Sequence, residues 1–73
     1  MTQQELKNIC QQKLQESIAS NDTKKIEIYT LIDQMLSQKD AIKMLGVEVT
    51  MNILYDLGFN KKQAQKIYLE FIK

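Results

Sequence analysis

Residues 51–73 place one glycine, Gly58, between two stretches in which apolar residues recur at the three- and four-residue spacing of an α-helix. The first stretch predicts a helix from about residue 50 to residue 57, and the second predicts a helix that begins after Asn60. Glycine is the usual residue where a helix ends in a left-handed turn. We therefore expect the two helices to fold back on each other through a tight turn.

The rest of the chain shows the same helical periodicity. Proline is absent, only two of the 73 residues are glycine, and no β-branched residues alternate with polar ones, so nothing predicts a sheet. A chain of this length forms one domain at most. We expect one all-α domain over residues 1–73, a compact bundle of four to five helices, with an N-terminal helical hairpin over residues 1–36 and a helix-turn-helix region over residues 37–73.

Capping residues predict where the first and last helices begin. Thr2 is followed three residues later by Glu5, which is the pattern of a capping box. Asn60 and Gln63 have the same spacing before the last helix. In such a box each side chain accepts a hydrogen bond from the backbone of the other residue, so both helix starts are well defined.

The boundaries in the middle of the chain are less sharp. Asp22 or Thr23 can cap the second helix. Ser37 and Asp40 have the spacing of another capping box, so the second helix either breaks there or runs on. Gly46 then predicts a left-handed stop.

Stripes of apolar residues indicate the buried side of each helix. The stripe of the first helix consists of Leu6, Ile9, Cys10, Leu14 and Ile18. The stripe of the second helix consists of Ile28, Leu31, Ile32, Met35 and Leu36, with Tyr29 at its edge. The stripe of the last helix consists of Ala64, Ile67, Tyr68, Phe71 and Ile72. We expect the second stripe to form the centre of the core.

The composition argues against several classes of function. The chain has no histidine and a single cysteine, Cys10, so it lacks the usual general base at neutral pH and the ligands of a zinc site. It also lacks a glycine-rich phosphate loop and the ligand spacing of a calcium loop. We expect no enzyme activity, no catalytic residue, no cofactor and no metal site.

Hydropathy and cysteine content bear on location. No apolar run approaches the ~20 residues that span a bilayer, and the first ten residues are polar. One cysteine cannot form an internal disulfide, which fits a reducing compartment. The sequence therefore predicts a cytoplasmic protein without a membrane partner.

Charge is distributed unevenly along the chain. The net charge is +1, but residues 1–56 carry six lysines and eight acids, whereas residues 57–73 carry four lysines and one acid. A local excess of positive charge on one helix is typical of a nucleic-acid-binding surface, and it is equally compatible with a solvated lysine face.

The residues around Gly58 fit the pattern of a DNA-reading helix-turn-helix. With Gly58 at the turn, the positions that such motifs keep apolar are Ile53, Leu54, Leu57, Phe59, Ala64 and Ile67. Leu54 is large where the motif usually has a small residue, and Ala64 is small where it usually has a branched one. Because these two positions face each other, the exchange conserves volume. Placing Gly46 at the turn instead would bury Asn52, at a cost of about 1–3 kcal/mol without hydrogen-bond partners.

This registration predicts which side chains face a DNA groove. The set is Asn60, Lys61, Lys62, Gln65 and Lys66. Lysine bonds guanine or phosphate, and asparagine or glutamine bonds adenine. Because the chain has no arginine, we expect weak, salt-sensitive binding of double-stranded DNA by each monomer. We also expect a homodimer, in which the N-terminal helices supply the contacts and two weak half-sites act together.

The segment DLGFNKKQAQKIYLEFIK resembles the opening of short helix-turn-helix proteins encoded beside integrases in Gram-positive integrative elements and phages. The shared pattern is a leucine, a glycine and an aromatic residue, four residues, an alanine, two residues and an isoleucine. The resemblance lies within the C-terminal third of the chain, which stops at Lys73 where those proteins continue. It implies a small DNA-binding regulator of transcription or an accessory factor of a phage or mobile element.

A second resemblance supports an alternative. Leu57-Gly58-Phe59 is similar to the Met-Gly-Phe loop of ubiquitin-associated three-helix modules and to the turns in three-helix repeats of RecA-regulating proteins. It implies a non-catalytic adaptor or inhibitor that binds a protein through the C-terminal helices or through the first helix. In that case Phe59, Ile67 and Phe71 would be partly exposed, and the lysines would form a solvated rim.

Overall fold

A computed structural model describes residues 1–72, and these residues form four α-helices without any strand. The helices are α1 (Gln3–Ala19), α2 (Thr23–Leu36), α3 (Ala41–Asp56) and α4 (Lys61–Phe71). The expected all-α, compact class is therefore confirmed. No helix within residues 1–72 is both long and apolar enough to cross a membrane.

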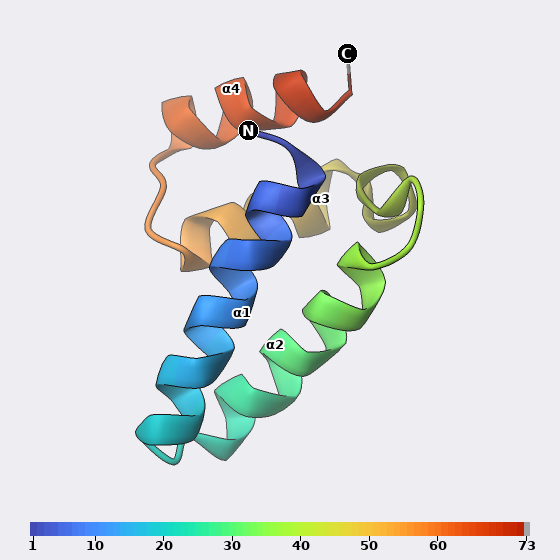
Figure 1. Cartoon of the computed structure of the whole chain (residues 1–73). Helices are drawn as coiled ribbons and strands as arrows, with labels where there is room; N and C mark the ends of the chain where they lie inside the picture. Colours follow the sequence, from blue (N-terminus) through green and yellow to red (C-terminus); the bar gives the residue numbers. More distant parts are fainter. Residues whose placement is uncertain (73) are drawn as a thin grey trace.

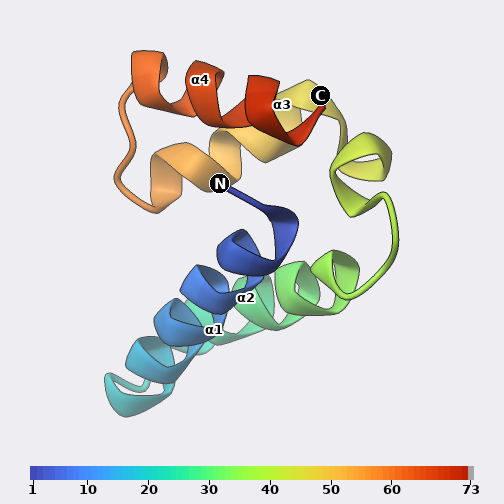
Figure 2. The same cartoon turned by 45° about the horizontal axis from the view of Figure 1, so that its top comes forward.

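The helices pack as two successive pairs. α1 and α2 run side by side as an antiparallel hairpin, and α3 with α4 lies across the open end of that hairpin (Figure 1). Figure 2 shows from another side that α4 lies farthest from the turn between α1 and α2. The amino group of Met1 pairs with Glu70, with 2.6 Å between the nitrogen and Oε2, so the start of the chain is tied to α4.

Local hydrogen bonds explain the N-terminal hairpin. The capping box of α1 is confirmed, since the Thr2 hydroxyl accepts from the Glu5 amide at 3.1 Å and the Glu5 carboxylate accepts from the Thr2 amide at 3.2 Å. α1 ends in a Schellman motif around Asn21, whose φ is +59°. Asp22 caps α2 by accepting from the Lys25 amide at 3.2 Å. These short-range bonds make residues 19–23 a tight turn.

The break after α2 differs from the expected capping box. Ser37 ends α2 and its hydroxyl donates to the Asp33 carbonyl at 3.0 Å, so it does not cap the next helix. Asp40 takes the N-cap position of α3 with φ +59° and makes no side-chain capping bond. The free carbonyl groups at the end of α2 accept hydrogen bonds from α1 instead. The Gln3 side-chain amide donates to the carbonyls of Leu36 and Gln38 at 2.9 and 2.8 Å. The spacing of residues in the sequence does not predict these long-range hydrogen bonds.

Gly46 confirms the expected helix stop, because its backbone is not helical and separates residues 41–45 of α3 from residues 47–56. Its φ of +82° confirms the expected positive value, but its ψ of 170° is extended and not left-handed helical. This region of backbone conformation is nearly restricted to glycine. The helix resumes at the next residue, so the expected start near residue 50 is wrong by about three residues. The kink turns residues 47–56 back toward α1.

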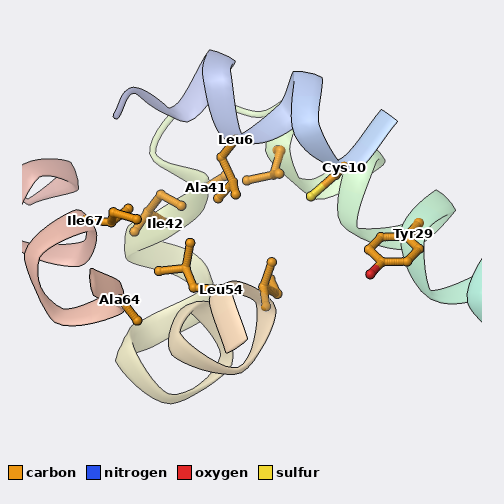
Figure 3. Packing of buried hydrophobic residues seen from close by; sticks show 10 residues of the cluster. Leu6, Cys10, Tyr29, Ala41, Ile42, Leu54, Ala64 and Ile67 are labelled. Atoms are coloured by element: carbon orange, nitrogen blue, oxygen red, sulfur yellow. The ribbon is translucent and has the colours of Figure 1, made fainter. Parts of the chain in front are cut away.

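The core joins all four helices. Leu6 and Cys10 of α1, Leu54 of α3 and Ala64 of α4 are fully buried. The other apolar members of the core are Tyr29, Leu36, Ala41, Ile42, Ile53 and Ile67. Figure 3 shows these side chains converging between the two helix pairs.

The expected burial of α1 and α2 is partly wrong. Ile18 is exposed, and the neighbouring Ser17 is buried in its place because its hydroxyl donates to the Lys13 carbonyl at 2.8 Å. In α2 the side chain at the core is Tyr29, which we expected at the edge of the stripe. Of the five stripe residues only Leu36 is buried and Ile32 is half-buried, whereas the three exposed ones are Ile28, Leu31 and Met35.

Candidate nucleic-acid interface

The turn at Gly58 is a complete Schellman motif. The Phe59 amide donates to the Leu54 carbonyl at 3.1 Å, and the Gly58 amide donates to the Tyr55 carbonyl at 3.0 Å. Gly58 has φ +101°, a value that side chains with a Cβ rarely adopt. Because these bonds close the end of α3, the chain reverses within residues 57–60 and α4 runs back over α3 (Figures 1 and 2).

The inner face of α4 is fixed by packing against α3. Leu54 and Ala64 are both fully buried and lie in the same core cluster, on the two helices that the turn joins (Figure 3). Ile53 and Ile67 are also buried, and Leu57 and Phe59 are half-buried against the same cluster. The six apolar positions around Gly58 thus all contribute to the core. Their burial forces the opposite face of α4 outward.

The outward face of α4 is cationic. The five side chains assigned to the groove are all exposed, namely Asn60, Lys61, Lys62, Gln65 and Lys66. Within residues 1–72 the three lysines form no ion pair, since the salt bridges there join the Met1 amino group to Glu70 and Lys13 to Glu16. Glu70, the one acid of α4, is bound by the Met1 amino group. No carboxylate within residues 1–72 therefore forms an ion pair with the lysines at the start of α4.

Asn60 has a structural task in addition. Its Oδ1 accepts from the Gln63 amide at 2.8 Å, and the Gln63 Oε1 accepts from the Asn60 amide at 3.0 Å. This confirms the expected capping box of α4. Because Oδ1 is committed to the cap, Asn60 is less suited to paired hydrogen bonds with adenine than Gln65, whose side chain is exposed and does not cap α4.

The arrangement combines several features that suit a phosphate backbone. The first N–H groups of a helix have no partners within that helix, and they carry partial positive charge. At the start of α4 these groups lie beside the exposed Lys61 and Lys62. Gln65 and Lys66 continue the same face one turn later. Together they form a short polar strip that offers donors to an anionic ligand.

One exposed residue on this face was not singled out from the sequence. Leu69 is 59% exposed and follows Lys62, Gln65 and Lys66 at helical spacing. The sequence does indicate its exposure, since residue 69 does not belong to the expected inner stripe of the last helix. The polar strip is therefore followed, toward the end of α4, by one exposed apolar side chain, Leu69.

The surface expected for a protein-binding adaptor is formed only in part, since Phe59 and Phe71 are partly exposed and Ile67 is not. Ile67, one of its three proposed contact residues, is buried at 9% exposure. Phe59 and Phe71 are half-buried and pack against the core cluster. A partner that needs all three side chains would have to separate α4 from α3.

No known protein family, no curated protein and no solved structure matches this chain in the comparisons that we made.

Proposed function

We propose that the α3–α4 pair is a helix-turn-helix that binds double-stranded DNA, and that the protein is a small regulator or accessory factor acting on DNA. The observation that carries the proposal is the exposed lysine face of α4, turned outward by the burial of Ala64 and Ile67 on the opposite side of the helix. Lys61, Lys62 and Lys66 bind phosphates or guanine, and Gln65 is the residue suited to adenine. The link to a phage or mobile element is supported by the sequence resemblance of residues 56–73 alone.

The distribution of charge makes the lysine face of α4 the best candidate for a DNA-binding surface in this molecule. A chain of net charge +1 gains little from its overall field, so binding must come from a local cluster. Three lysines on one helix face provide roughly three phosphate contacts, which gives weak binding that decreases steeply with salt. Specific recognition then requires two such faces on one DNA.

The double variant Lys61→Ala, Lys62→Ala is expected to weaken binding to duplex DNA about ten- to hundredfold at low salt, because two phosphate contacts are lost. The slope of log affinity against log salt should decrease by about 2 in magnitude for the same reason. Fluorescence anisotropy with labelled duplexes over a salt series measures both quantities.

The chain supplies a matched control for this experiment. Lys39 and Lys43 lie just before and in the first turn of α3, and both are exposed. The variant Lys39→Ala, Lys43→Ala changes the net charge equally and should leave most of the affinity intact. Equal losses in the two variants, or no binding by folded protein at low salt, would contradict the proposal.

A protein-binding adaptor remains the second candidate, and the exposed Leu69 is the observation in its favour. An adaptor of this kind retains a protein partner after nuclease treatment and loses it on Leu69→Glu. Because Leu69 is 59% exposed, this substitution should leave the helical fold intact, which circular dichroism checks. If Leu69→Glu loses the protein partner while its binding to DNA stays the same as that of the wild type, then α4 binds the partner through Leu69.

A further inference from the structure

α2 carries an apolar stripe on the side that faces away from the core. Its residues are Ile28, Leu31 and Met35, which are 44%, 61% and 37% exposed. They are spaced by three and four residues and therefore line one side of the helix. The stripe has the spacing of a helix-pairing seam, in which apolar residues alternate at three and four positions.

The same helix is also apolar on its inner side. Tyr29 and Leu36 are buried in the core, and Ile32 is half-buried between the two sides. An exposed apolar surface that continues from the buried side of a helix is a common site of contact with another protein chain. In this chain α1 and α3 cover only the inner side of α2.

The exposed area of the whole molecule points the same way. A monomeric protein of 8.5 kDa is expected to expose about 4,650 Å², whereas this chain exposes 5209 Å². The excess is about 560 Å² per molecule, and two copies together have an excess of about 1,100 Å². An interface of roughly 1,000 Å² between two copies would remove about as much exposed area as this excess.

We propose that a second copy of this chain covers the outer stripe of α2, and that the two α2 helices pair antiparallel about a twofold axis near Leu31. Parallel pairing would bring Lys24 and Lys25 of the two copies together at the same end. Antiparallel pairing separates the two lysine pairs and places each near the C-terminal end of the other helix, which carries partial negative charge and is followed by one lysine, Lys39, instead of a second pair. The homodimer does not depend on the proposed DNA binding.

This seam differs from the one that α1 would have formed. The apolar residues at the centre of the α1 stripe, Leu6 and Cys10, are buried inside the monomer and are not available to a partner. α2 lies apart from α4 in both views (Figures 1 and 2). Dimerisation through α2 therefore leaves the cationic face of both α4 helices free.

The variant Leu31→Glu tests the seam because it places two carboxylates near the twofold axis. We expect wild-type protein to sediment with twice the 8.5 kDa mass of one chain, and Leu31→Glu to sediment with the mass of one chain. The dimer dissociation constant should rise more than about hundredfold, since like charges brought together in an interface are strongly unfavourable. Leu69→Glu is the matched control, because Leu69 is the same residue type on α4 with nearly the same exposure and should stay dimeric.

A second variant keeps the test decisive if Leu31→Glu fails to fold. Leu31→Cys should form an intermolecular disulfide under mild oxidation, whereas Leu69→Cys should not. The native Cys10 does not interfere because its side chain is fully buried. A monomeric wild type at about 1 mM, or equal cross-linking of the two cysteine variants, would overturn the proposal.

Discussion

Replacing Leu54 with alanine is expected to lower the free energy of unfolding by about 3–5 kcal/mol, because the side chain is fully buried and its removal leaves a cavity. A domain of 73 residues has a total stability of only about 4–11 kcal/mol. The expected loss is therefore a large fraction of the total stability, and the variant should unfold at a clearly lower urea concentration than the wild type. Urea unfolding followed by circular dichroism measures the change.

A double variant tests whether Leu54 and Ala64 share one packing site. Ala64→Leu alone should cost about 1–3 kcal/mol by overpacking. Combined with Leu54→Ala, the new side chain fills the cavity that the first substitution creates. The double variant should thus be more stable than the two single effects predict, by at least about 1 kcal/mol. This swap also restores the small and branched residues that helix-turn-helix motifs usually have at these positions.

Tyr29 provides the control for this cycle. Tyr29 is also buried, but it lies at the far end of the core cluster from Ala64 (Figure 3). Tyr29→Ala and Ala64→Leu should add within about 0.5 kcal/mol. If Leu54→Ala and Ala64→Leu add equally well, the two side chains do not share a packing site.

Stability should decrease by about 2 kcal/mol between pH 9 and pH 11 because of Cys10. Burial raises the pKa of the Cys10 thiol from 9.0 to about 11, and the nearby Asp33 carboxylate acts in the same direction. Above pH 9 the unfolded chain loses the thiol proton while the folded chain keeps it, so the unfolded state gains stability. The contribution is fully present below pH 9 and is lost as the pH rises through the folded pKa.

Urea unfolding at pH 8 and pH 10.5 measures this decrease, and Cys10→Ala isolates its cause. The alanine variant should be less stable overall but should show a smaller decrease with pH. Part of the decrease should remain, because burial also raises the pKa of Tyr29 above its ordinary value of 10.0. A pH dependence that is the same in both proteins would exclude Cys10 as the titrating group.

The sequence predicts the fold class and the helix starts well where the determining interactions are local. The capping boxes at Thr2 and Asn60 need only neighbouring residues, and both are present. The turn at Gly58 and the inner face of α4 also follow from local spacing, because α4 has apolar residues mainly on one side. The exposure of the candidate site residues was predictable for the same reason.

The orientation of α2 could not be predicted from spacing. Its apolar residues cover one broad side of the helix, and only part of that side is buried. Which part turns inward depends on how α1 and α3 pack, and Tyr29 rather than Leu31 meets that surface. The end of α2 likewise depends on Gln3, more than thirty residues away in the sequence.

The pairing of each helix with its neighbour along the chain has a consequence for folding speed. α1 packs mainly on α2, and α3 packs mainly on α4, so most contacts close short loops. Helical proteins with such low contact order fold in microseconds to milliseconds. We expect a temperature jump, followed by infrared absorption, to show relaxation of the isolated monomer on that timescale. The N-terminal helix pair, α1 and α2, can therefore form its hairpin before α3 and α4 have left the ribosome.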